Sequence, residues 1–325
     1  MFLGAEGAAD MIEKTTAFTI FGKELCVKNY KCSHNGCPYV QKDRPLKMQL
    51  SLRLTSYCGA SCRFCSAACG KGIKEFLNLK YLETVLNEMK RLNAVRGISI
   101  TGGEPFTDIG LLNETIEMIF DILGVWTEIS INTNGIGLKD IHKIKRLKYV
   151  DTVHISRHHY DDKKNRAYFG MDVPDSEAIK EAVQSVYDPR IFVLNCLLLK
   201  GGIGSSKEMK NYLEWAGDIG IKKAGFITAM PVNDYAAKNR VSYKDIFVVD
   251  EAILYTDRFD DFEYCNCRDG IYASSSGRMV EFYGRETGYG GPDFVRGFVL
   301  GPDGVLRTGY GEKAGIVADL KREIV

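Results

Sequence analysis

The chain has 325 residues, of which 45% are hydrophobic and 26% are charged, so it can bury the core of a large globular protein. Its 43 lysines and arginines nearly balance its 42 aspartates and glutamates, which excludes a general electrostatic attraction to nucleic acid or to a membrane surface. No stretch approaches the roughly 20 consecutive apolar residues of a transmembrane helix, and the N-terminus lacks the pattern of a signal peptide. We therefore expect a cytoplasmic protein with neither a nucleic-acid nor a membrane partner.

The order of apolar residues along the chain predicts an α/β fold with three regions. Residues 1–45 form an N-terminal extension, residues 46–230 alternate strand and helix patterns, and residues 231–325 form a Gly- and Tyr-rich C-terminal extension. We expect the C-terminal extension to consist of short strands and loops that cover the mouth of the central region. The predicted strands cover 48–54, 95–101, 127–133, 150–156, 190–199 and 222–230, and the predicted helices cover 79–92, 112–123, 138–147, 179–186 and 205–216.

Six β–α units in this order predict parallel strands joined by right-handed crossovers. In such sheets the functional residues gather where the strands end, at their C-terminal edge. The motifs described below all follow the predicted strands directly, which is consistent with one site at this edge.

Three cysteines follow the first predicted strand with the spacing C-x3-C-x2-C, at Cys58, Cys62 and Cys65. Thiolates are the usual protein ligands of iron–sulfur clusters, and three on one short loop can hold three irons of a 4Fe–4S cluster and leave the fourth iron open. A structural zinc site is the alternative, with Cys69 as a fourth ligand, but no second Cys or His pair follows at a matching distance.

This cysteine loop resembles the signature of the radical S-adenosylmethionine (radical SAM) superfamily, in which the open iron binds the methionine amino and carboxylate groups. Phe64 stands at the aromatic position that lies beside adenine in the family. The second predicted strand ends in Thr101-Gly-Gly-Glu-Pro105, and the family uses such an element to hold the methionine amino group. The resemblance therefore implies that Gly102, Gly103 and Glu104 bind the cofactor.

Three further polar residues stand near the ends of later strands. Asn132 matches a frequent cofactor contact of the family, although an Asn-Gly turn is the plainer interpretation of the segment that follows it. Ser156 matches the position whose hydroxyl contacts the ribose. Asn195 lies inside an apolar strand and needs a partner, which can be cofactor, substrate or backbone.

The resemblance, of the broad MoaA/PqqE-like kind, implies a partial (β/α)6 TIM-type barrel and an enzyme. Its reduced cluster, supplied with electrons by a donor such as flavodoxin or ferredoxin, would cleave S-adenosylmethionine to a 5′-deoxyadenosyl radical. That radical would abstract hydrogen from an unactivated C–H bond of a small metabolite or nucleotide. The alternatives are a maturase of a ribosomally made peptide and a non-catalytic iron–sulfur redox or sensor protein.

Two groups outside these motifs remain candidates. His158, His159 and Tyr160 follow the fourth strand, where they can contact substrate or transfer a proton, although a loop histidine is commonly only solvated. The flanking regions carry a cysteine pair each, and these can hold a second 4Fe–4S cluster or be ordinary thiols; the seven-cysteine pattern of the SPASM group is absent. The four residues of this proposed second cluster are Cys32, Cys37, Cys265 and Cys267.

Overall fold

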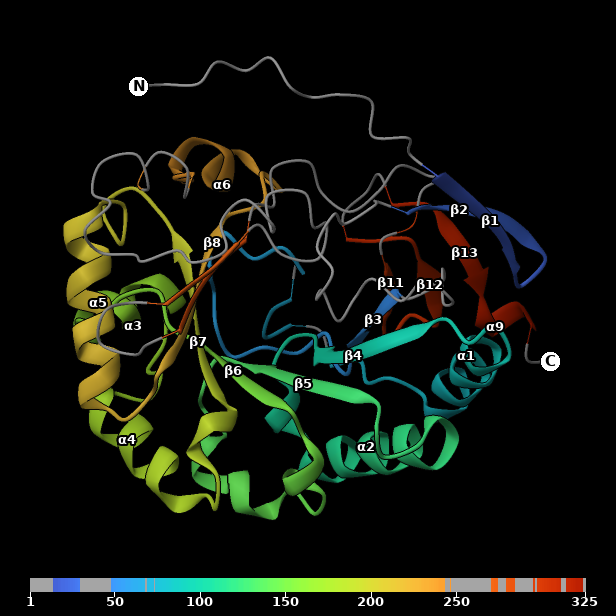
Figure 1. Ribbon diagram of the computed structural model, residues 1–325, viewed down its shortest axis with the longest axis horizontal. Coiled ribbons are helices and arrows are strands. Elements are labelled where there is room, and N and C mark those ends of the chain that lie inside the picture. Colours follow the sequence, from blue (N-terminus) through green and yellow to red (C-terminus); the bar gives the residue numbers. More distant parts are fainter. Residues whose placement is uncertain are drawn as a thin grey trace.

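The computed structural model describes residues 14–29, 48–67, 69–72, 74–242, 246, 270–273, 279–283, 295, 297–310 and 314–323. Six consecutive parallel strands form the centre of its large sheet, each bonded to the next (Figure 1). This order confirms the predicted six-stranded α/β core, which is an open partial barrel. The strands are β3 (Met48–Arg53), β4 (Val95–Thr101), β5 (Glu128–Thr133), β6 (Thr152–Ser156), β7 (Phe192–Leu198) and β8 (Lys223–Thr228).

The helices between these strands cover the outer side of the curved sheet (Figure 1). Side-chain caps set the starts of α1 and α5, where Asn78 accepts from Lys80 N and Ser205 accepts from Glu208 N. Short helical turns join β5 to β6. The helices between the strands are α1 (Leu79–Arg91), α2 (Ile109–Leu123), α3 (Asp162–Phe169), α4 (Ser176–Ser185) and α5 (Ser206–Asp218), and α6 (Asp234–Asn239) follows β8.

The main hydrophobic core lies between the sheet and these helices. Ile100, Ile131 and Val153 belong to neighbouring strands and are fully buried with the apolar face of α2. Because side chains alternate along a strand, the residues next to them face the inside of the curved sheet. That inner face carries polar residues, including Ser99 and Ser130, and it lines a cavity.

The C-terminal extension contributes strands to both edges of this sheet, which the sequence did not predict. β10 (Met279–Tyr283) pairs in parallel with β8, and β11 (Gly297–Leu300) pairs in parallel with β3 at the opposite edge. Edge strands present unpaired N–H and C=O groups, and these two strands satisfy them. In its described part the C-terminal extension therefore extends the sheet, and its expected cover of the barrel mouth stays a prediction. Its other members are β9 (Gly270–Ala273), β12 (Val305–Arg307), β13 (Ile316–Asp319) and the terminal helix α9 (Leu320–Glu323).

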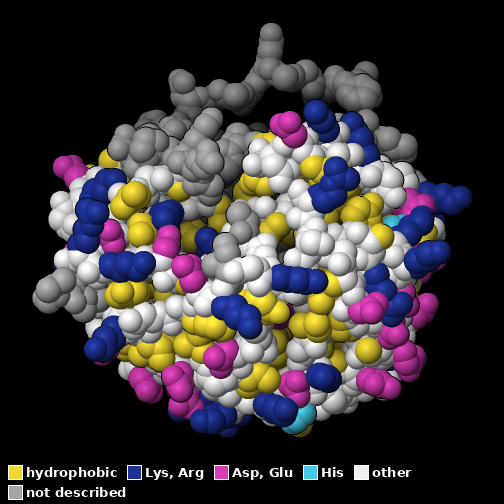
Figure 2. All heavy atoms as spheres, turned by 180° about the vertical axis from the view of Figure 1, so that it is seen from behind, with side chains coloured by type: hydrophobic (Ala, Val, Ile, Leu, Met, Phe, Trp, Pro, Cys, Tyr) yellow, Lys and Arg dark blue, Asp and Glu magenta, His cyan; other side chains and the backbone are white. Residues whose placement is uncertain are grey.

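The N-terminal extension contains an antiparallel hairpin, β1 (Lys14–Ile20) with β2 (Lys23–Asn29). Its Phe18 packs edge-on against Phe298 of β11, so the hairpin lies against the C-terminal strands (Figure 1). Figure 2 shows basic and acidic side chains interspersed over the face that it displays, in keeping with the near-zero net charge. No helix in the described part of the chain combines the length and the apolar character needed to span a bilayer.

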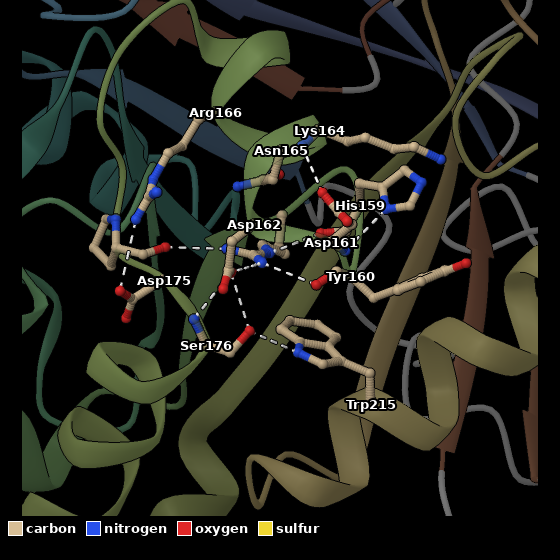
Figure 3. Close-up of polar contacts among 12 residues, drawn as sticks. His159, Tyr160, Asp161, Asp162, Lys164, Asn165, Arg166, Asp175, Ser176 and Trp215 are labelled. Carbon is tan, nitrogen blue, oxygen red and sulfur yellow. Dashed lines mark hydrogen bonds and ion pairs between the residues drawn. The ribbon is translucent and has the colours of Figure 1, made fainter.

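Arg157 fixes the loop that follows β6. Its side chain is only 1% exposed, and it pairs with Asp162 at the start of α3. The guanidinium also donates to the carbonyl oxygens of His159 (2.8 Å) and Pro174 (3.0 Å). A second cluster of contacts, in which Trp215 Nε1 donates to the Ser176 hydroxyl at 2.9 Å, ties α5 to the same place (Figure 3). The loop is thus held between β6, α3 and α5.

Replacing Arg157 by Met is expected to lower the free energy of unfolding by about 3–5 kcal/mol. It removes the cation that pairs with Asp162, which keeps only its hydrogen bonds from Ser176, and it removes the donor to the carbonyl oxygens of His159, Pro174 and Tyr160. Urea denaturation checks this. The control is Arg190→Met, because the Arg190–Asp188 pair is exposed and should contribute little. If both substitutions lowered the free energy of unfolding equally, the Arg157–Asp162 pair would contribute no more to stability than the exposed pair.

Candidate active site

The three cysteines of the C-x3-C-x2-C loop line one cavity at the C-terminal ends of the parallel strands. The cavity has a volume of about 600 Å³ and extends along the inner face of the sheet. Cys58, Cys62 and Cys65 share its wall with Phe64. The loop therefore brings its thiols to the edge where the sequence predicted a site.

The Gly-Gly-Glu segment after β4 binds the cysteine loop through its backbone. Gly103 N donates to Thr55 O at 2.7 Å, and Glu104 N donates to Tyr57 O at 3.0 Å. A Cβ atom at Gly103 would lie 1.8 Å from Tyr57 O, and Gly102 has a φ of +127°. Both glycines also line the cavity. They are needed for close approach between two chain segments, whether or not they contact a ligand.

The Glu104 carboxylate joins the ends of β4 and β5. It accepts hydrogen bonds from Thr133 Oγ1 (2.7 Å) and Asn134 N (2.7 Å), and from the backbone N–H of Phe106 (3.2 Å). Burial raises the pKa of Glu104 to about 7, even though these three donors favour the charged form. The carboxylate is buried beneath the cavity wall, so its predicted contact with an ammonium group stays a prediction.

The three loop cysteines are half-buried and close enough to influence one another. Burial, with the neighbouring thiolates of Cys65 and Cys58, raises the pKa of Cys62 to about 12. Burial also raises the pKa of Cys58, and thiols such as Cys58 and Cys62 ionise near neutral pH only when a cationic centre offsets their charge, as a metal cluster does. Within the described residues, no three His, Cys, Asp or Glu side chains are placed so that they could together bind a single metal ion. Three thiol donors on one cavity wall fit a 4Fe–4S cluster.

Cys69, the alternative fourth ligand, is hydrogen-bonded to Arg53 and Ala67. Its Sγ accepts a hydrogen bond from Arg53 Nη2 at 3.5 Å and donates to Ala67 O at 3.5 Å. Arg53 also donates to Ala67 O at 2.8 Å. These contacts turn the Cys69 thiol toward Arg53, and the cavity lining contains the other three cysteines of the loop without it.

The three polar residues predicted on later strands all line the cavity. Asn132 Nδ2 donates to Ser99 Oγ at 2.8 Å, and the Ser156 side chain lies at the end of β6. Asn195 finds its partner in His154, with 3.3 Å between Oδ1 and Nδ1. The sequence analysis did not single out His154, although it stands two residues before Ser156 on the same face of the strand.

His158 lines the cavity and has a backbone partner at one ring nitrogen. Its Nδ1 accepts a hydrogen bond from Leu197 N at 3.2 Å, so the proton of the neutral ring must be on Nε2. The ring stacks on Phe169 and meets Phe64 edge-on, both with centroids 5.0 Å apart. Burial and the nearby Arg157 charge lower the pKa of His158 to about 3. Near neutral pH it is a rigid hydrogen-bond donor, unsuited to carry a proton.

His159 and Tyr160 are directed away from this cavity toward α5. His159 Nδ1 accepts from Asp161 N at 2.9 Å (Figure 3). The Tyr160 hydroxyl donates to Glu208 Oε2 at 3.0 Å. The structure therefore separates the three residues predicted as catalytic and leaves His158 as the one at the cavity. Cys32, Cys37, Cys265 and Cys267 lie outside the described residues.

The family model of the Radical SAM superfamily matches residues 52–237 of the chain. A protein of Sulfurisphaera tokodaii named "Probable GTP 3′,8-cyclase" is 28% identical over 218 residues, which cover 66% of this chain and 65% of the relative. A protein of the same name from Pyrococcus horikoshii is 25% identical over 172 residues, and the match covers 52% of this chain and 52% of that relative. The matched part of the chain thus spans less than two thirds of either relative.

Two solved structures share the fold at low sequence identity. Streptococcus suis SuiB bound to precursor peptide SuiA aligns with a TM-score of 0.56 and 17% identity, over 80% of this chain and 59% of SuiB. Native anSMEcpe with bound AdoMet aligns with a TM-score of 0.52 and 14% identity, over 84% of this chain and 80% of that protein. Both likenesses concern the arrangement of strands and helices.

Replacing Gly103 by Ala is expected to cut the iron bound after anaerobic reconstitution at least several-fold, because the new Cβ displaces Tyr57 and with it the cysteine loop. Iron and sulfide analysis checks this. Gly70→Ala is the matched control in the same loop, since no atom lies within 4 Å of a Cβ built there. Full iron content in the Gly103 variant would contradict the proposed contact.

The pKa of about 3 for His158 predicts a dependence of stability on pH. Between pH 6.5 and 3 the unfolded chain binds a proton at this histidine that the folded chain does not bind. As the pH is lowered through this range, His158 therefore decreases the free energy of unfolding by about 1.4 kcal/mol per pH unit. Glu104 has the opposite effect on stability. Because its pKa is raised in the folded state, it contributes to the free energy of unfolding at low pH, and this contribution is lost as the pH rises from 4.5 through 7.

Comparison of variants isolates the histidine effect. His158→Gln should show a shallower decline in unfolding free energy than the wild type as pH falls from 6.5 to 4, measured by urea denaturation of the metal-free protein. The exposed His142→Gln should keep the wild-type slope. Identical slopes in all three proteins would show that His158 is protonated in the folded state.

Proposed function

The chain belongs to the radical SAM superfamily, and on that premise we propose that it abstracts hydrogen from an unactivated C–H bond of a small metabolite or nucleotide. The superfamily consists of enzymes with a 4Fe–4S cluster and S-adenosylmethionine. The observation that carries the proposal is the shared cavity, whose wall combines the three loop cysteines with every residue predicted to contact the cofactor except Glu104, which is buried beneath that wall.

Each group of residues has a distinct part in this proposal. Cys58, Cys62 and Cys65 would hold the cluster, and a bound, reduced cluster would supply the electron for reductive cleavage of S-adenosylmethionine to a 5′-deoxyadenosyl radical. The backbone of Gly102 and Gly103, which lines the cavity, would bind the methionine moiety. The polar side chains of the inner sheet face orient the cofactor and substrate. The cofactor-binding set is Phe64, Gly102, Gly103, Glu104, Asn132, Ser156 and Asn195.

The side chains around His158 limit access of water to the reacting groups. Phe64 and Phe169 form apolar surfaces on two sides of the His158 ring. An apolar surround suits radical chemistry, because it keeps a reactive intermediate from other hydrogen donors and from solvent. We assign His158 a binding role at the cavity, as a fixed donor through Nε2, rather than that of an acid or base.

A nucleotide is the substrate class with the most support. The relatives named "Probable GTP 3′,8-cyclase" reach 28% identity, whereas the likeness to the peptide-bound SuiB structure is confined to the fold. A flavodoxin or ferredoxin would supply the electron in a cytoplasmic setting. A second cluster on Cys32, Cys37, Cys265 and Cys267 remains part of the proposal.

Anaerobic reconstitution with iron and sulfide, followed by dithionite and S-adenosylmethionine, should yield 5′-deoxyadenosine, which liquid chromatography detects. Ala at Cys58, Cys62 or Cys65 should abolish the product, because each variant removes one ligand of the cluster. Cys26→Ala is the control, since Cys26 lies in the N-terminal hairpin.

Two outcomes of these assays decide the finer points. A wild-type protein that binds a full cluster yet gives no 5′-deoxyadenosine, even with nucleotide substrates, would refute the proposed reaction. Combining the three alanine substitutions removes the loop cluster, so about four irons remaining per chain would indicate the second cluster and near none would exclude it.

A further inference from the structure

Asn134 contacts one of the three cysteine sulfurs. It stands just beyond the end of β5, and its Nδ2 lies 3.8 Å from the Sγ of Cys58, within the range of an N–H···S hydrogen bond. Asn134 is only 9% exposed, and it lines the same cavity as the cysteines. The contact links residues that are 76 positions apart in the sequence.

The orientation of the Asn134 amide is determined by its other contacts. Its Oδ1 accepts a hydrogen bond from Ile136 N at 3.0 Å. An amide oxygen is the only end of the side chain that can accept there, so the NH₂ end must face Cys58. The Asn134 backbone N–H donates to Glu104 Oε2 at 2.7 Å, which fixes the main chain at this position as well.

The contact makes the three cysteines unequal. Cys58 Sγ also accepts from Ala60 N at 3.4 Å, so it has one backbone donor and one side-chain donor. Among the described residues, Asn134 is the only side chain that donates to a sulfur of Cys58, Cys62 or Cys65. The nearby Arg53 donates to Cys69, outside this set.

A hydrogen bond to a ligating sulfur changes the electronic properties of a cluster. It withdraws electron density from the thiolate, stabilises the more negative reduced state and raises the reduction potential. Low dielectric strengthens the effect, because an amide dipole near a buried sulfur is poorly screened by water.

We propose that Asn134 is a positioning residue that sets the reduction potential of the 4Fe–4S cluster through its hydrogen bond to Cys58. The inference rests on the proposed cluster at Cys58, Cys62 and Cys65. It adds a function to an Asn-Gly segment that local sequence describes as a turn. A purely structural turn residue would affect folding and leave the potential unchanged.

The test is a redox titration of the reconstituted protein followed by electron paramagnetic resonance, without S-adenosylmethionine. Asn134→Ser removes the reach to Cys58, while the serine hydroxyl can still accept from Ile136 N. The variant should have a lower midpoint potential, with a shift of about tenfold in the one-electron reduction equilibrium, or about 59 mV.

Asn113→Ser is the matched control. Asn113 is similarly buried, at 8% exposure, and its amide bridges Lys143 O (3.0 Å) and Lys145 N (2.9 Å) on the outer side of the sheet. This substitution should lower stability and leave the potential at the wild-type value. An Asn134 variant with full iron content and an unchanged potential would overturn the inference, as would an equal shift in the Asn113 control.

A second measurement uses the wild-type protein, so it does not depend on whether a variant still binds its cluster. In wild-type protein whose asparagine side-chain amides carry ¹⁵N, the reduced cluster should show a ¹⁵N hyperfine coupling in pulsed electron paramagnetic resonance. Its absence would overturn the inference. A protein that binds no cluster at all would refute the proposed function instead, so the two failures are distinguishable.

Discussion

The architecture of the site depends on the backbone contact between the Gly-Gly-Glu segment and the cysteine loop. Two hydrogen bonds, from Gly103 N to Thr55 O and from Glu104 N to Tyr57 O, bring the segments together with no space for a side chain at Gly103. The cysteine positions follow from this contact. The buried Glu104 carboxylate accepts hydrogen bonds from Thr133 and Asn134 at the end of β5. The ends of β3, β4 and β5 are therefore fixed relative to one another.

The polar inner face of the sheet distinguishes this fold from a barrel with a packed interior. Closed barrels of this type fill their centre with branched apolar side chains. Here Asn195, His154 and Thr152 form a hydrogen-bonded row on the inner face, and the cavity runs along them. Stability therefore comes chiefly from the outer side, where the strands bury Ile100 and Ile131 against helices. This division leaves the inner residues available for ligand.

The sequence was informative where local pattern decides structure, and less so where distant segments meet. Period-two and helical repeats located the six central strands and most of their helices, and the cysteine spacing located the cavity wall. Helix α3 was not predicted because Asp162–Phe169 has little apolar periodicity, and its one local signal was the Asp161 cap at its start. The roles of His158 and Asn134 depend on contacts with Leu197 and Cys58, which no local pattern contains.

The pairing of the late strands β10 and β11 with opposite edges of the sheet has a consequence for biosynthesis. β3 is translated first among the central strands, yet its outer neighbour β11 leaves the ribosome only after the whole parallel core. Throughout that interval the nascent chain exposes a long edge of unpaired backbone, which is prone to intermolecular pairing. Heterologous production should therefore benefit from slow synthesis, low temperature or co-expressed chaperones.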